Sequence, residues 1–143
     1  RDPVVTRRLP RVPSVVLPVL REELASEYPD LTVGSWYADV DHRTFPLLSV
    51  RRLGGVANDP ARLDFPVLEM TAYTRDGLVA TEDLYLDARA VILDMVERQR
   101  VTEAGYLHSF TEVMGPTLLS SPFEDTWRIT GSIQVGLRPL RNQ

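Results

Sequence analysis

The chain has 143 residues, of which 43% are hydrophobic and 25% are charged, and its formal net charge at pH 7 is -4. These values are ordinary for a globular protein, and the length predicts one domain that buries roughly 68–70% of its unfolded surface. Because the chain contains no cysteine, disulfides, thiolate zinc sites and cysteine nucleophiles are excluded. The mild acidity argues against a general nucleic-acid binder, which carries a basic domain or stripe.

No apolar run approaches the roughly 20 residues that span a membrane. Residues 1–14 are basic but lack the continuous apolar stretch of a secretory signal, so we expect no signal there. All 16 basic residues are arginine. The codon bias of a GC-rich genome explains this, and so does a surface built for protein contacts, since interfaces are enriched in arginine and depleted of lysine.

The N-terminal residues 1–12 form a basic arm ahead of the predicted α+β domain, residues 13–143. Prolines in the arm disfavour regular structure. The arm is therefore either a frayed terminus or a segment that lies on a neighbouring subunit.

The first predicted elements of the domain are a helix over residues 13–28 and a strand over residues 31–37. Apolar residues recur at helical spacing in the first of these segments. Ser14 is placed to cap the helix, and Pro18 is tolerable in its first turn.

Residues 45–75 predict a long hairpin with a polar tip. Residues 46–50 are apolar on both faces, which indicates a strand covered on both sides. Residues 64–74 alternate and form the return strand, and Gly54 and Gly55 can take the positive φ values that a turn needs. The predicted loop carries Arg51, Arg52, Gly54, Gly55, Asn58, Asp59 and Pro60.

The second half of the chain predicts a helix over residues 79–98, a strand over 106–114, a loop over 115–122 and a strand over 125–138. The last strand alternates most regularly, with one apolar and one polar face. The whole pattern predicts an α+β fold in which two helices pack on a mainly antiparallel, or mixed, sheet of about five strands.

Candidate sites for metal or acid–base chemistry are sparse. The segment Asp39-Val-Asp41-His42 could hold a cation weakly, but a solvated loop explains it better, because no H-x-x-x-H or H-E-x-x-H occurs. His108 lies on a predicted strand and is expected to be a packed or interface residue.

Nucleophilic and phosphate-binding sites are equally poorly supported. No G-x-S-x-G is present, and turn formation explains Ser120 and Ser121 in their proline-bounded loop. The segment from Arg51 to Gly55 lacks the lysine and the following helix of a phosphate-binding loop. We therefore expect no enzymatic activity and no cofactor.

The order of elements and several short motifs resemble the tail terminator proteins of long, non-contractile-tailed bacteriophages, especially those of actinobacterial hosts. The resemblance covers residues 13–139. The motifs are V-L-P-V-L-R-E-E-L, F-P-L-L-S-V-R-R-L-G-G, D-F-P-V-L-E-M, A-T-E-D-L-Y-L-D-A-R and I-Q-V-G-L-R-P.

The resemblance implies a structural virion protein that is assembled in the host cytoplasm. Such proteins form a ring, expected to be a hexamer, which caps the head-proximal end of the tail tube and stops its polymerisation. The implied partners are further copies of the chain, the tail tube protein, head-completion proteins of the neck and the tape measure protein. DNA passes through the lumen only, and no membrane is involved.

A ring needs two different, complementary surfaces on each subunit. The Arg-Gly-Gly segment offers a basic surface, and the acidic helix face offers a complement. The candidate interface residues are Arg51, Arg52, Gly54, Gly55, Asp64, Glu82, Asp83, Asp87 and Arg138. Another neck component, namely a head-closure or tail-completion protein, is the first alternative, and a small hydrolase or ligand-binding domain is the second.

Overall fold

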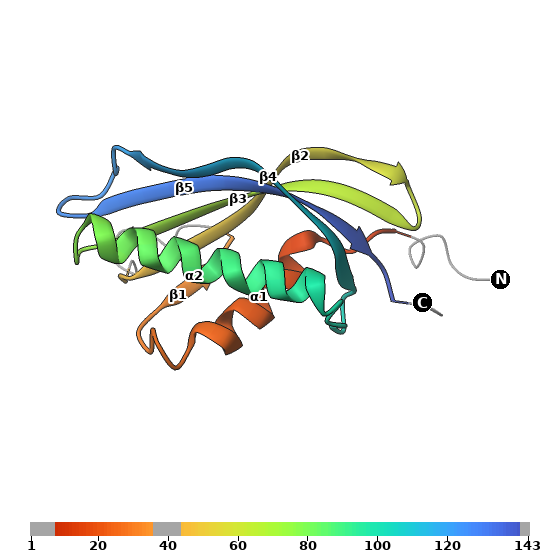
Figure 1. Ribbon diagram of the computed structural model, residues 1–143, viewed down its shortest axis with the longest axis horizontal. Coiled ribbons are helices and arrows are strands. Elements are labelled where there is room, and N and C mark those ends of the chain that lie inside the picture. The colour runs from red at the N-terminus through yellow and green to blue at the C-terminus, as the bar shows by residue number, and fades with distance from the viewer. Residues whose placement is uncertain (1–7, 36–43, 141–143) are drawn as a thin grey trace.

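The computed structural model describes residues 8–35 and 44–140, and Figure 1 shows their arrangement. Within these residues five strands form one sheet in the order β1-β2-β3-β5-β4. Only β1 and β2 pair in parallel, so the predicted α+β fold with a mixed sheet is confirmed. The elements are α1 (Val12–Leu24), β1 (Thr32–Gly34), β2 (Leu47–Asp59), β3 (Leu63–Thr74), α2 (Leu78–Glu97), β4 (Tyr106–Leu119) and β5 (Trp127–Arg138).

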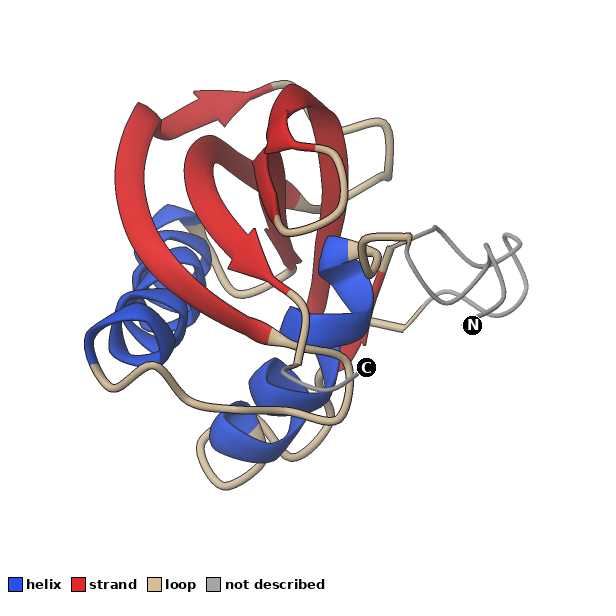
Figure 2. Cartoon of the chain, turned by 90° about the vertical axis from the view of Figure 1, so that its right-hand side faces the viewer, coloured by secondary structure: helices blue, strands red, loops and turns tan. Residues whose placement is uncertain are grey.

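The core lies between the two helices and one face of a strongly twisted sheet (Figures 1 and 2). The alternation predicted for β3 and β5 is confirmed, because their apolar sets point into this core. Helix α2 packs its apolar stripe on β3, β4 and β5. The fully buried side chains include Leu20, Leu48, Leu68, Met70, Leu84, Ile92, Met95, Ile133 and Leu137.

Helix α1 begins differently from the prediction. Arg11 is the N-cap and makes no side-chain capping bond, so the predicted cap at Ser14 is wrong. The backbone N–H of Ser14 instead donates to the carbonyl of Arg11 at 3.0 Å. Pro18 lies inside the helix and not in its first turn. Its side chain faces solvent, away from the core.

The Arg-Gly-Gly segment lies within a strand, and the predicted loop is wrong at this point. β2 runs over Leu47–Asp59, and the hairpin turn comes later, at residues 60–62. The register with β3 shifts between Arg52 and Gly55, which marks a β-bulge. Gly54 and Gly55 have φ angles of 76° and 85°. The expected positive φ values are thus present, but they bend a long strand instead of closing its turn.

Strand β4 is also longer than predicted. It reaches Leu119 and passes through Gly115 and Pro116, which the sequence placed in a loop. Its register is irregular at two places between Glu112 and Thr117. Proline is tolerated here because β4 is the outer strand of the sheet, where one side needs no backbone N–H donor.

The remaining boundaries differ less. α2 and β5 begin within two residues of their predicted starts. Helix α1 ends at Leu24 instead of residue 28, because residues 25–27 form a turn. β1 covers only Thr32–Gly34 of the predicted strand, whose residues 36 and 37 lie outside the described parts of the chain.

The polar face of β5 is covered at its centre, contrary to the half-buried strand that the sequence predicts. Thr130 is 2% exposed, and its hydroxyl pairs with that of Thr71 on β3 at 2.8 Å. The Thr130 hydroxyl also donates to the carbonyl of Met70 at 3.2 Å. These bonds satisfy the buried hydroxyl groups, which would otherwise destabilise the sheet.

Candidate assembly interface

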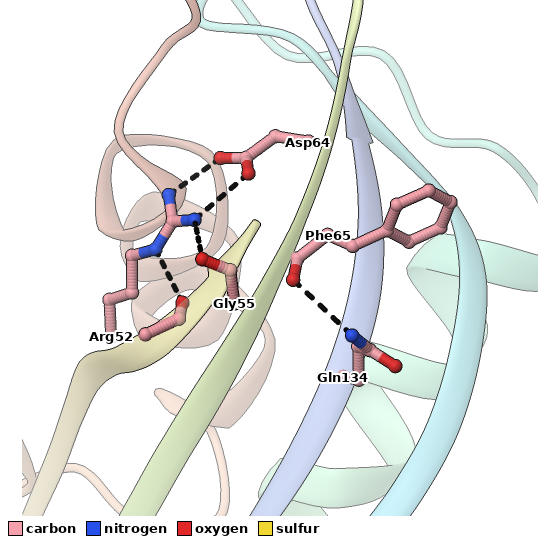
Figure 3. Close-up of polar contacts among 6 residues, drawn as sticks. Arg52, Gly55, Asp64, Phe65 and Gln134 are labelled. Atoms are coloured by element: carbon pink, nitrogen blue, oxygen red, sulfur yellow. Dashed lines mark hydrogen bonds and ion pairs between the residues drawn. The ribbon is translucent and has the colours of Figure 1, made fainter. Parts of the chain in front are cut away.

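Arg52 holds the bulge of β2 against β3 (Figure 3). Its guanidinium donates to both carboxylate oxygens of Asp64, with Nη1 to Oδ2 at 2.6 Å and Nη2 to Oδ1 at 2.9 Å. The same group donates to the carbonyl oxygens of Gly54 at 2.7 Å and Gly55 at 3.3 Å. Asp64 is only 2% exposed. Four predicted interface residues are therefore joined in one internal cluster that fixes the hairpin.

The side chain of Arg51 points away from that of its neighbour Arg52. Adjacent residues of a strand point to opposite faces. Arg51 therefore lies on the helix-free face, where its Nε donates to Glu69 at 2.7 Å. The Arg51 side chain is 52% exposed. Of the two arginines it is the one that presents more of its surface to a partner.

A groove of about 480 Å³ lies between the segment that precedes α1 and the β2–β3 hairpin. Arg52 and Asp64 form part of its wall, so the internal ion pair also borders this groove. No local sequence pattern indicated this groove, because its wall combines segments far apart in the chain. The groove is lined by Leu9, Pro10, Arg11, Val12, Pro13, Arg52, Ala57 and Asp64.

Arg138 lies beside a second, smaller depression of about 260 Å³, which it lines together with Arg62 and Tyr106. His108 packs edge-on against Phe65, with ring centroids 6.0 Å apart, so its expected packed role is confirmed. Burial lowers the pKa of His108 below its ordinary value, and the positive charge of Arg138 acts in the same direction.

The three predicted acidic residues of α2 separate into two groups. Glu82 and Asp83 are exposed. Asp87 is half-buried and accepts a hydrogen bond of 2.5 Å from the hydroxyl of Tyr28. Burial and this bond raise the pKa of Tyr28 well above its ordinary value. Asp87 thus ties α2 to the chain that follows α1, and Glu82 and Asp83 stay at the surface.

A set of apolar side chains is exposed at the surface, which the sequence patterns did not predict. Val56 and Val79 are the most exposed of them, at 75% and 73%. For Leu53, Val56, Leu118 and Leu119 the available signal was their position in segments predicted to be loops, where burial was not expected. No such signal marked Val79 or Trp127, which lie in a predicted helix and a predicted strand. The exposed large apolar residues include Leu53, Val56, Leu78, Val79, Leu118, Leu119 and Trp127.

The segment Asp39 to His42 lies outside the described residues. No group of three or more His, Asp or Glu side chains suited to a metal ion occurs in the described ranges. Ser121 bonds through its hydroxyl to Thr126 at 2.5 Å and to the backbone N–H of Phe123 at 3.2 Å. Turn formation therefore accounts for this serine. No helix in the described ranges is long and apolar enough to cross a membrane.

A family model for phage tail termination proteins matches residues 8–143, almost the whole chain. The chain belongs to this family. The tail termination protein is 49% identical over 136 residues to the Gene 22 protein of Mycobacterium phage L5, a match that covers 94% of this chain and 96% of that protein. It is 45% identical over 136 residues to the Gene 22 protein of Mycobacterium phage D29, with the same coverage.

A solved structure shares the fold of this tail termination protein. A chain from the structure titled "Virion of native gene transfer agent (GTA) particle" superposes with a TM-score of 0.61 and 17% sequence identity. The match covers 90% of this chain and 95% of that chain. The expected family and the actinobacterial origin of its relatives are therefore confirmed. The protein is a structural component of the phage tail and hence of the virion.

Proposed function

We propose that the tail termination protein forms a ring on the head-proximal end of the tail tube. The ring stops polymerisation of the tube and presents a docking surface to the head-completion proteins of the neck. The family match over residues 8–143 carries this proposal. Exposed apolar side chains on β2, α2 and β4 support it, since such groups on a single subunit mark assembly contacts.

A ring of six copies is the assembly that the family resemblance implies. Closed rings arise when a subunit binds its neighbour through two different surfaces and the rotation between copies closes. The proposed role is structural and requires no catalytic step. The net charge of -4 suits a lumen through which DNA moves, because attraction to phosphate grows with the number of neutralising cations.

Electron microscopy of the purified protein mixed with its own tail tubes tests the proposal. The expected result is a ring at one end of each tube, together with arrest of further tube growth when tube protein is added. Protein that forms no ring and binds no tube end would refute the proposed function.

Deletion of the gene in the phage separates termination from another role in the neck. Loss of a terminator predicts headless tails of excessive length. Loss of a head-closure component predicts tails of normal length beside heads that leak DNA, and this second outcome would favour the alternative function.

A further inference from the structure

Exposed apolar side chains gather at one end of the molecule, which we name the apolar end. Register in the sheet places Trp127 of β5 beside Thr74, the last residue of β3. The hydroxyl of Thr74 pairs with that of Thr81 at 2.8 Å, so the start of α2 lies at the same end of the sheet (Figure 1). The apolar end comprises Leu78, Val79, Leu118, Leu119 and Trp127.

Acidic groups surround the apolar end. Two arginines near it are engaged within the chain: Arg75 lies over the ring of Phe45 at 5.0 Å, and Arg128 donates to the carbonyl of Ser120 at 3.3 Å. The apolar end therefore combines apolar contact surface with a negative rim. The exposed acids of this rim are Asp76, Glu82, Asp83, Glu124 and Asp125.

The opposite end of the long axis, which we name the basic end, holds the β2–β3 hairpin and the last residues of β5 (Figure 1). Pairing of Ala57 with Asp64, and of Asp64 with Leu137, brings these segments together. Arg62 and Arg138 are exposed and form no ion pair with any residue of the described ranges. The basic end comprises Arg11, Leu53, Val56, Arg62 and Arg138.

We propose that the apolar end of one copy docks on the basic end of the next copy, which gives the proposed ring its subunit contact. This inference rests on the proposed function. Each end offers exposed apolar side chains beside exposed charges, and the predominant sign is negative at the apolar end and positive at the basic end. Apolar contact supplies the affinity of such an interface, and complementary charges fix its orientation.

The position of the two ends determines the kind of assembly. They lie at opposite ends of the longest axis of the molecule (Figure 1). A contact between them is heterologous, because it uses a different surface on each copy, and it leaves one apolar end and one basic end unoccupied on every partial assembly. Growth therefore continues until the ring closes. A symmetric dimer would need one surface to bind itself, which like charges at each end oppose.

Two variants with one blocked end each test the proposal. Val56→Asp places a charge on the basic end, and Val79→Asp places one on the apolar end. Both side chains are more than two-thirds exposed, so the fold is expected to persist. Each variant alone is expected to lose ring formation on tail tubes. Val113→Asp is the matched control, since Val113 is 57% exposed and lies midway along β4, away from both ends.

Mixing the two blocked variants tests the contact more directly than either variant alone. The intact apolar end of Val56→Asp can bind the intact basic end of Val79→Asp, whereas contact between the two blocked ends would bury both introduced carboxylates in an apolar interface. A 1:1 mixture is therefore expected to yield dimers and no larger species by light scattering. Association of Val56→Asp with itself, or absence of dimers in a mixture whose wild-type protein associates, would overturn the proposal.

Cysteine cross-linking tests the same contact on assembled rings, because the chain has no cysteine of its own. The double variant Val56→Cys with Val79→Cys, bound to tail tubes and treated with a short bis-maleimide, is expected to give a covalent ladder of several subunits. Either single variant is expected to give monomers only. The pair Val113→Cys with Val79→Cys is the control and is expected to give no ladder.

The outcomes separate this inference from the function on which it rests. Rings that cap tubes with both blocked variants would refute the contact and leave the proposed function standing. Rings that form normally with Val79→Asp but no longer bind tubes would assign the apolar end to the tube protein instead. Wild-type protein that forms no ring on tubes would refute both.

Discussion

Arg52 and Asp64 are joined by two hydrogen bonds, at 2.6 and 2.9 Å, across the bulge that bends β2. Asp64 is buried, whereas the side chain of Arg52 is 37% exposed. A bidentate pair of this kind fixes the relative orientation of the two side chains as well as the distance between them. The pair therefore sets the angle at which the hairpin leaves the sheet.

Replacement of Arg52 by alanine is expected to destabilise the fold, because it leaves the buried Asp64 carboxylate without its cation. Loss of one partner of a buried pair costs about 3–5 kcal/mol. Since Arg52 is partly exposed, we expect about 2 kcal/mol. The midpoint of urea unfolding, at unchanged m value, measures this loss.

Arg51→Ala is the matched control for this substitution. Arg51 is adjacent in the chain and pairs with Glu69, but its side chain is 52% exposed. Exposed pairs contribute about 0–1 kcal/mol. Equal shifts of the urea midpoint in the two variants would contradict a special role for the Arg52–Asp64 pair.

The two glycines of the bulge are expected to differ in their tolerance of alanine. Both have positive φ, which costs about 1–2 kcal/mol for a residue with a side chain. A Cβ at Gly54 would meet nothing within 4 Å, whereas at Gly55 it would lie 2.2 Å from the carbonyl oxygen of Phe65. Overpacking adds about 1–3 kcal/mol at Gly55.

Thermal or urea unfolding of Gly54→Ala and Gly55→Ala measures this difference. Each variant acts as the control for the other, because both share the change of residue and the left-handed backbone. A Gly54→Ala protein as unstable as Gly55→Ala would show that backbone conformation alone, and not close approach to β3, requires glycine here.

The stability of the protein is expected to fall as the pH drops below 6.5, in part through His108. Burial lowers the pKa of His108 from its ordinary value of 6.5, so the unfolded chain takes up this proton first. The contribution of neutral His108 to the free energy of unfolding is fully present above pH 6.5. It is lost as the pH falls through the lower pKa of the folded state.

His108→Gln is expected to flatten the pH dependence of unfolding free energy in this range. Comparison of the variant with the wild type removes the contribution of carboxyl groups, which both proteins share. Titration of the imidazole by NMR gives an independent value. An imidazole pKa at or above 6.5 in the folded protein would contradict the prediction.

Contacts of Arg51 and Arg52 with a neighbouring subunit or with the tube remain predictions. Reversal of charge at Arg52 would also break the hairpin, so Arg51→Glu is the cleaner test. We expect this variant to fold, with an unfolding midpoint close to that of the wild type, but to cap tail tubes less efficiently.

Capping by Arg51→Glu is measured as the fraction of tube ends that carry a ring in electron micrographs. Arg98→Glu is the control, because Arg98 is an exposed arginine with a single local ion pair to Asp94. Full capping by Arg51→Glu would remove Arg51 from the interface.

The order of the elements, the α+β class and the core-facing residues of β3, β5 and α2 could be predicted from the sequence. Alternation and helical spacing are local signals, and they arise because one face of each element meets the core. The family was also accessible, since its motifs lie in order along the chain. The boundaries failed where glycine and proline occur inside β2 and β4, because these residues mark a bulge or an edge strand as well as a turn.

Local sequence patterns were enough to locate the helices, the strands and most of the residues that fill the core. The tertiary structure set the partners of the charged residues, such as Asp64 with Arg52 and Asp87 with Tyr28. It also decided which apolar residues stay exposed, and it gathered several of them at two opposite ends of the molecule. These features depend on the register between strands and on helix packing, which join residues far apart in the chain and leave no local pattern.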